Sequence, residues 1–225
     1  GGITAAFAVA AALADRNRTS GTFIDVSMLE AVMATMGWAV SNHLIAGREP
    51  KPMGNENVTA SPSGTFQTQD GLLNIAANKQ EQFEAVCHVV GLPQLIADER
   101  FHERQSRLQN RAELKALLEE AMSTKTTEEW WKLFNRAGVP AGPVYSVPQA
   151  LDHPQVATRG MVGTFENAPG VGRDIRLVRT AFKVNGETPR VYTPPPALGQ
   201  HADEILADLG YSAEEIDALR EEKAV

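Results

Sequence analysis

The polar residues best suited to bind a ligand are gathered in one loop, residues 55–64, with the sequence NENVTASPSG. Asparagine, serine, threonine and glycine expose both backbone and side-chain hydrogen-bonding groups. A loop of this composition can cover a ligand or close over an anionic intermediate. It can equally be a solvated linker between domains, because prolines prevent regular structure across residues 47–63. The pattern alone leaves both interpretations open.

Two other groups could carry nucleophilic or acid–base chemistry. Cys87 and His88 are adjacent, but neighbours on a helix point roughly 100° apart, so we predict that Cys87 is a packed core thiol. Asp25 and Glu30 could form a carboxylate pair at a strand-to-helix junction. We favour structural roles for both, since Ser27 and Glu30 fit a capping box and the helix dipole favours Asp25.

Metal and aromatic sites are less favoured by the sequence. The five histidines show no metal-ligand spacing, so we expect them at the surface or half-buried and predict no metal site. They are His43, His88, His102, His153 and His201. Trp130 and Trp131 cannot share one helix face. We expect one in the core and the other half-exposed, with an aromatic ligand platform as the alternative.

Length and composition exclude several classes of protein. The 225 residues allow one or two domains, with 43% hydrophobic and 22% charged residues and a net charge of −7. No basic segment is interleaved with aromatics, so nucleic acid is not an expected partner. No apolar run reaches the ~18 residues of a membrane span. The single cysteine excludes an internal disulfide and fits a cytoplasmic protein.

Local patterns predict a mixture of helices and strands. Residues 4–16 are alanine-rich and favour a helix, and residues 23–26 alternate like a short strand. The capped helix that begins after Ser27 is expected to end at Gly47. Asp70 and Gly71 predict a hairpin turn. Its strands are expected at residues 64–68 and 72–77, and two further strands at 160–165 and 174–184. Further helices are expected at 78–90, 110–122, 126–137, 146–151, 201–209 and 212–219.

Five groups of residues follow one another in an order that suggests a family. They are GGITAA with AAL at residues 1–13, GTFIDVSMLEA at 21–31, GN with SPSGTF and DG at 54–71, RLQN with AGVPAGPV at 107–144, and LGQHAD with LADLGYS at 198–212. Together they resemble the class III CoA-transferases, the family of formyl-CoA and carnitine CoA-transferases that also includes α-methylacyl-CoA racemase. The resemblance covers nearly the whole chain.

The resemblance implies an α/β fold with an α+β small domain. Residues 1–46 are expected to form the C-terminal part of a Rossmann-like large-domain core, and residues 47–64 a linker and a loop that covers the active site. Residues 65–159 would form the small domain of a hairpin and helices. Residues 160–225 would form a return segment and the C-terminal helices. Two chains of this family interlock, so a homodimer is expected.

The family's chemistry uses a CoA thioester and a carboxylic acid as substrates, without a permanently bound cofactor. An aspartate attacks the thioester and forms mixed-anhydride and aspartyl-CoA intermediates, which divide a difficult exchange into easier steps. That aspartate lies upstream of the family's GG helix. The resemblance therefore places no catalytic residue in this chain and implies a missing N-terminal half before Gly1.

The substrate-binding residues implied by the resemblance lie at the junction before the second helix and in the covering loop. They are Met28, Asn57, Ser61, Pro62, Ser63 and Gly64. The corresponding loop of formyl-CoA transferase is glycine-rich, whereas VTASPS is stiffer and bulkier, which argues against formyl or oxalyl specificity. Racemases carry a glutamate just after the hairpin, where this chain has Gln80, which weakens a racemase interpretation.

The sequence thus predicts the C-terminal part of an acyl-CoA:carboxylate CoA-transferase, active only with its upstream half. Two alternatives stay open. One is a non-catalytic dimerisation or binding module of the same fold. The other is a 2-methylacyl-CoA racemase.

Overall fold

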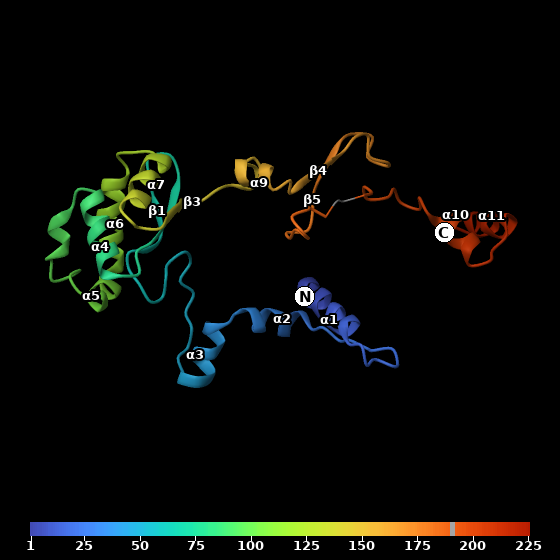
Figure 1. The fold of residues 1–225 in the computed structure, drawn as a ribbon, viewed down its shortest axis with the longest axis horizontal. Helices are drawn as coiled ribbons and strands as arrows, with labels where there is room; N and C mark the ends of the chain where they lie inside the picture. The colour runs from blue at the N-terminus through green and yellow to red at the C-terminus, as the bar shows by residue number, and fades with distance from the viewer. Residues whose placement is uncertain (190–191) are drawn as a thin grey trace. The chain divides into compact units, whose positions relative to one another are not determined.

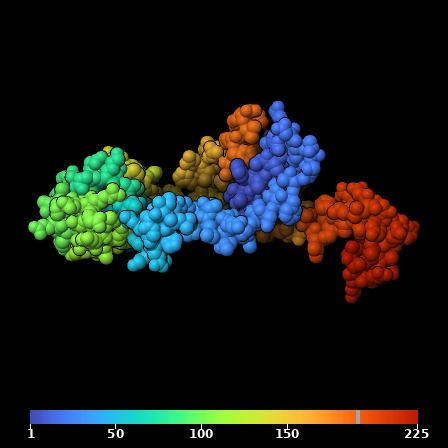
Figure 2. Space-filling model, turned by 90° about the horizontal axis from the view of Figure 1, so that it is seen from below, coloured from blue at the N-terminus to red at the C-terminus, as the bar shows by residue number. Residues whose placement is uncertain are grey.

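The computed structural model describes residues 1–189 and 192–225, and these form two units, Gly1–Gly142 and Pro143–Val225. Both units can be followed by their colours in Figures 1 and 2. Helices are combined with a three-stranded and a two-stranded sheet, so the predicted mixture of helices and strands is confirmed. None of the described helices is long and apolar enough to cross a membrane.

The first unit begins with three helices, α1 (Gly2–Ala14), α2 (Met28–Thr35) and α3 (Trp38–Ala46). Ala31 is the only buried residue in them. Their large apolar side chains are exposed, among them Ile3, Phe7, Leu13, Met28, Leu29, Trp38, Leu44 and Ile45. These helices therefore gain little stability from apolar burial within the described chain.

Two predictions for this segment are wrong. Residues 23–26 are extended but form no strand, because no other described segment supplies a partner for their backbone hydrogen bonds. The single helix expected between Ser27 and Gly47 is broken after Thr35. Gly37 adopts a φ of +55° there, which a helix cannot contain. The predicted ends are confirmed: Ser27 Oγ accepts a hydrogen bond from the Glu30 amide at 3.3 Å, and Gly47 terminates α3 in the left-handed conformation.

The predicted hairpin is confirmed as β1 (Ser63–Gln67) and β2 (Leu72–Ala76), paired antiparallel with Ser63 opposite Ala76. β3 (Ala141–Pro143) joins the other edge of β2. Leu73 and Ile75 are buried, while Asn74 between them is exposed on the other face of the strand. β2 therefore has one face against the core and one face exposed, whereas Ser63–Phe66 of β1 are buried on both faces.

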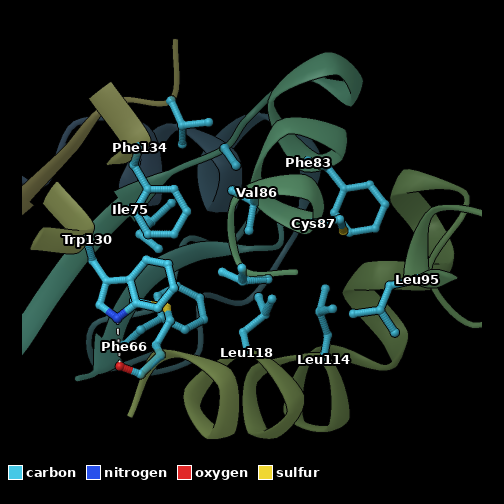
Figure 3. Packing of buried hydrophobic residues seen from close by; sticks show 14 of the residues in the cluster. Phe66, Ile75, Phe83, Val86, Cys87, Leu95, Leu114, Leu118, Trp130 and Phe134 are labelled. Atoms are coloured by element: carbon cyan, nitrogen blue, oxygen red, sulfur yellow. Dashed lines mark hydrogen bonds between the residues drawn. The ribbon is translucent and has the colours of Figure 1, made fainter. Parts of the chain in front are cut away.

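Four helices and a 3₁₀ turn complete this unit: α4 (Gln80–Val89), the turn Pro93–Ile96, α5 (Arg104–Gln109), α6 (Arg111–Met122) and α7 (Thr127–Arg136). α5 was not predicted. The helices pack with the hairpin around one core (Figure 3), whose fully buried side chains include Phe66, Phe83, Leu114, Leu118 and Phe134. The indole nitrogen of Trp130 donates a hydrogen bond to the Met122 carbonyl at 2.7 Å. Trp131 is half-buried, which confirms the predicted contrast between the two tryptophans.

The second unit contains short elements: α8 (Val147–Leu151), α9 (Pro154–Thr158), β4 (Val162–Phe165), β5 (Ile175–Val178), α10 (Ala202–Asp208) and α11 (Ala213–Glu221). β4 and β5 pair antiparallel. The strand predicted at 174–184 is too long, because pairing with β4 stops at Val178. α9 was not predicted. Capping boxes begin α8 at Ser146 and α11 at Ser212, where the helix starts were predicted.

The hairpin turn is joined to the start of α7 by Asp70. Its Oδ1 accepts hydrogen bonds from the Thr127 amide at 2.7 Å and from Thr127 Oγ1 at 2.8 Å. These bonds, and one from Thr68, lower the pKa of the Asp70 carboxyl. A carboxylate is also favoured at this position by the helix dipole.

The Asp70→Asn variant should be less stable at neutral pH, and its deficit should shrink in acid. The folded chain lowers the pKa of Asp70, so the stabilisation is present above the ordinary pKa of about 4 and is lost as the pH falls through the folded value. Urea unfolding between pH 7 and pH 3 measures the difference in free energy. Asp25→Asn, at an exposed carboxylate, is the control; a deficit independent of pH would contradict the assignment.

Candidate functional site

A polar cleft of about 330 Å³ lies beside the hairpin of the first unit. It is lined by the start of the predicted loop, the beginning of β1, the outer face of β2 and a residue two positions before α4. The lining residues are Gly54, Asn55, Glu56, Asn57, Ser63, Gly64, Asn74, Ala76 and Asn78. Four of the nine are asparagines, and one, Glu56, is charged. The cleft therefore offers neutral hydrogen-bond donors and acceptors side by side.

A row of basic side chains holds the loop that forms one wall of this cleft. It consists of Arg104 and Arg107 on α5 and Arg111 and Lys115 on α6, and is called the basic row below. Arg104 and Arg107 are three residues apart on α5, and Arg111 and Lys115 are four residues apart on α6, so each pair lies on one side of its helix. Each side chain faces a group between residues 56 and 61.

Arg107 is the buried member of the row, with 3% of its surface exposed. Its Nε donates to the Ser61 carbonyl at 2.9 Å, and its Nη1 donates to the carbonyls of Phe101 at 2.8 Å and His102 at 3.2 Å. The guanidinium carbon lies 4.2 Å from the centre of the Phe83 ring, a cation–π contact. Burial lowers the pKa of Arg107 from its ordinary value, but an arginine stays charged.

The other members of the row contact the loop at residues that precede Ser61. Arg104 donates twice to the Thr59 carbonyl, from Nε at 2.9 Å and Nη2 at 2.7 Å. Lys115 Nζ lies 2.7 Å from Glu56 Oε1, and Arg111 Nη1 lies 3.7 Å from Glu56 Oε2 without a hydrogen bond. The one acidic side chain in the cleft lining is therefore paired with cations from α6.

Hydrogen bonds within the loop complete its shape. The Asn57 amide donates to the Ser63 carbonyl at 2.9 Å, which closes the loop at the mouth of the hairpin. Asn57 Oδ1 accepts from the amide and the hydroxyl of Thr59, at 2.8 and 3.0 Å. The Pro62 carbonyl accepts from the Ala77 amide at 3.3 Å. This pattern leaves the loop ordered and partly buried rather than a solvated linker.

Gly64 permits the closest approach between loop and strand. A Cβ atom at this position would lie 2.8 Å from the Asn55 carbonyl oxygen and 2.8 Å from Glu56 Oε2. Its φ of +152° also lies in the region that favours glycine. The cleft wall can therefore pack against β1 only when residue 64 lacks a side chain.

The structure divides the six predicted site residues into three groups. Asn57, Ser63 and Gly64 line the cleft. Ser61 and Pro62 are buried in the same loop and do not line it. Met28 is 78% exposed in α2, outside the cleft lining.

Sequence reasoning missed the residues that face the loop from other elements. Asn74 could have been found from its alternation with buried Leu73 and Ile75 along β2. Asn78 follows the same strand, just before α4. The basic row could have been noticed from its helical spacing, although α5 itself was not predicted.

Cys87 is unsuited to nucleophilic chemistry, as predicted. Its side chain is fully buried, and burial raises the pKa of the thiol to about 12, so it carries almost no thiolate at neutral pH. Within residues 1–189 and 192–225, no three histidine, cysteine, aspartate or glutamate side chains gather as metal ligands do. The described residues thus form a polar binding cleft with no activated nucleophile in its lining.

Comparison with known proteins identifies the family. The family model described as CoA-transferase family III matches residues 1–202, and the chain belongs to this family. Succinyl-CoA:glutarate CoA-transferase of Mus musculus is 34% identical over 209 residues, which cover 92% of this chain and 48% of the relative. Acetyl-CoA:oxalate CoA-transferase of Acetobacter aceti is 37% identical over 163 residues, which cover 72% of this chain and 42% of the relative.

Solved structures show the same relationship. A CAIB/BAIF family protein from Brucella suis superposes with a TM-score of 0.77 at 30% identity, covering 92% of this chain and 53% of that protein. Rv3272 from M. tuberculosis gives a TM-score of 0.70 at 30% identity. The chain therefore spans about half the length of the curated relatives and solved structures that it matches.

Replacing Gly64 by alanine should destabilise the first unit by about 1–3 kcal/mol, because the new Cβ is both strained and too close to two oxygens. Chemical unfolding followed by circular dichroism measures the change. Gly142→Ala is the matched control, since no atom lies within 4 Å of a Cβ at that strand position. Equal stabilities of the two variants would contradict the packing described for the cleft wall.

Proposed function

We propose that this chain is the C-terminal part of an acyl-CoA:carboxylate CoA-transferase. The observation that carries the proposal is the family match across residues 1–202, together with relatives that are named as transferases of CoA to dicarboxylic acids. The nucleophilic aspartate is supplied upstream, in the part of the enzyme that this chain does not span. The chain contributes substrate binding and no catalytic residue.

The cleft beside the hairpin is the proposed substrate site. Its volume of about 330 Å³ is near the lower end for small-molecule pockets, which suits a small acyl group or acid. Asn57, Ser63 and Gly64 contact the substrate there in this proposal. Ser61 and Pro62 belong to the same binding loop, and Met28 lies near the CoA thioester in the assembled enzyme.

The exposed apolar side chains of α1–α3 support a larger assembly. Ile3 is 89% exposed and Phe7 is 76% exposed, although large apolar patches on soluble proteins usually mark contact surfaces. We assign this surface to contacts with the remainder of the large domain and, within an interlocked homodimer, with the second copy. The proposal thus accounts for helices that bury almost nothing within the described chain.

Transfer is preferred over racemisation because of Gln80. Its side-chain amide donates to Glu84 Oε1 at 3.1 Å, and an amide cannot act as the base that removes a proton from the α-carbon of the thioester. A non-catalytic binding module of the same fold is the remaining alternative. A transferase moves CoA from a thioester to an acceptor acid, whereas a non-catalytic module transfers no CoA.

The assay supplies the upstream half together with this chain and offers succinyl-CoA with glutarate, and acetyl-CoA with oxalate. We expect the CoA thiol to leave one acyl group and appear on the acceptor carboxylate, with the original acid released and no accumulation of free CoA. Mass spectrometry of the thioesters measures this exchange. A folded complex that binds the thioester but transfers CoA to neither acid would overturn the transferase proposal.

Two controls separate the alternatives. Deuterium incorporation at the α-carbon of a 2-methylacyl-CoA in heavy water would indicate racemisation instead of transfer. Calorimetry of the isolated chain tests the binding module: a folded oligomer that binds no CoA favours it, and tight CoA binding contradicts it.

A further inference from the structure

We propose that Arg107 is a positioning residue, which fixes residues 57–63 in the conformation that shapes the cleft and thereby sets substrate affinity without touching the substrate. The consequence for affinity rests on the proposed function, whereas the consequence for loop structure does not. Neither the family match nor the named relatives assigns a role to this side chain.

Burying Arg107 has a cost in free energy. A charged side chain that is 3% exposed loses most of its hydration, which is unfavourable unless its donors are satisfied. Its hydrogen bonds run to carbonyl oxygens of Ser61, Phe101 and His102. These bonds tie the loop to the segment that leads into α5, so the guanidinium and the loop conformation stabilise each other.

A short path of bonded residues connects Arg107 to the cleft. Ser61, which Arg107 holds, is two residues from Ser63, and Ser63 lines the cleft. The Ser63 carbonyl in turn accepts the amide of Asn57, which lies on the opposite side of the loop and also lines the cleft. A shift of the Ser61 carbonyl therefore moves two lining residues together.

The other row members contact the loop farther from β1 and from less buried positions. Arg104 holds the Thr59 carbonyl but is itself exposed, and Lys115 holds Glu56 at the start of the loop. Arg107 holds Ser61, next to the start of β1, from a site shielded from water and from competing ions. It is therefore the row member whose loss should loosen the loop most.

The test uses Arg107→Lys, which keeps the positive charge but lacks the planar fork needed to reach all three carbonyls. Hydrogen exchange is followed at the amides of Asn57, Thr59 and Ala77, whose acceptors belong to the loop. We expect exchange to become about tenfold faster or more, the factor that one hydrogen bond from a charged donor is worth. Exchange at core helix amides such as Leu118 should change much less.

Arg100→Lys is the matched control. Arg100 also lies beside an aromatic ring, at 4.9 Å from the centre of Phe101, but it pairs with Asp98 and Glu113 and not with the loop. It should leave exchange at Asn57, Thr59 and Ala77 unchanged. If Arg107→Lys does not fold, Arg107→Gln replaces it, and exchange at Asn57, Thr59 and Ala77 should still rise, because the hydrogen bond from the guanidinium to the Ser61 carbonyl is lost.

The second readout is kinetic and uses the assembled enzyme. We expect Arg107→Lys to raise KM at least about tenfold while kcat changes less, because the loop and not the nucleophile is displaced. Unchanged loop exchange overturns the proposal, as does faster exchange spread equally through the core. A fall in kcat with KM unaltered also overturns it. An inactive parent enzyme contradicts the proposed function alone, since loop exchange still decides the role of Arg107.

Discussion

The hydrogen bonds of one buried guanidinium join the loop beside the cleft to the segment that leads into α5. The segment before β1 carries backbone carbonyls into the protein, yet no neighbouring strand is placed to satisfy them there. Buried carbonyls require donors, and Arg107 provides them at Ser61 while also binding two carbonyls near the start of α5. The Arg107 side chain thus satisfies a backbone carbonyl of the loop, as interstrand hydrogen bonds satisfy the carbonyls of β1 and β2.

Apolar burial is distributed unevenly along the first unit. The hairpin and α4–α7 enclose a continuous core with fully buried aromatic and aliphatic side chains. α1–α3 are richer in apolar residues than α4–α7 but leave them exposed or half-buried, with Ala31 as the only buried one. Because isolated short helices are marginal in water, stable α1–α3 require a further surface. The core around the hairpin has no such requirement, and it is the part that carries the cleft.

The features that could be predicted from sequence are those specified within a few residues. The capping boxes at Thr126, Ser146 and Ser212 depend on contacts three residues apart, and the Asp70–Gly71 turn fixes its own hairpin. The strand expected at 23–26 failed because strand formation needs a distant partner. The break at Gly37 was missed because apolar periodicity continues across it, and only the backbone conformation reveals it.

In the candidate site, too, only the features specified by nearby residues could be predicted. The loop could be recognised by composition, which led to Asn57, Ser63 and Gly64. The contacts that shape it could not be inferred, because they join residues 45 to 59 positions apart in the chain. Helical spacing shows that Arg104 and Arg107 share a side of α5 and that Arg111 and Lys115 share a side of α6, but it does not show what these side chains face.

Because the side chains of the basic row contact the loop, their positive charges do not line the cleft. Lys115 and Arg111 are turned toward Glu56, and Arg104 and Arg107 toward carbonyl oxygens, while none of the four is among the cleft-lining residues. The lining is dominated by asparagine amides, which orient a polar group without supplying a full positive charge. In the proposed function, charge that develops during CoA transfer would be stabilised chiefly by groups outside this lining. The cleft would then orient the substrate, and the part of the enzyme that this chain does not span would supply the nucleophile and its electrostatics.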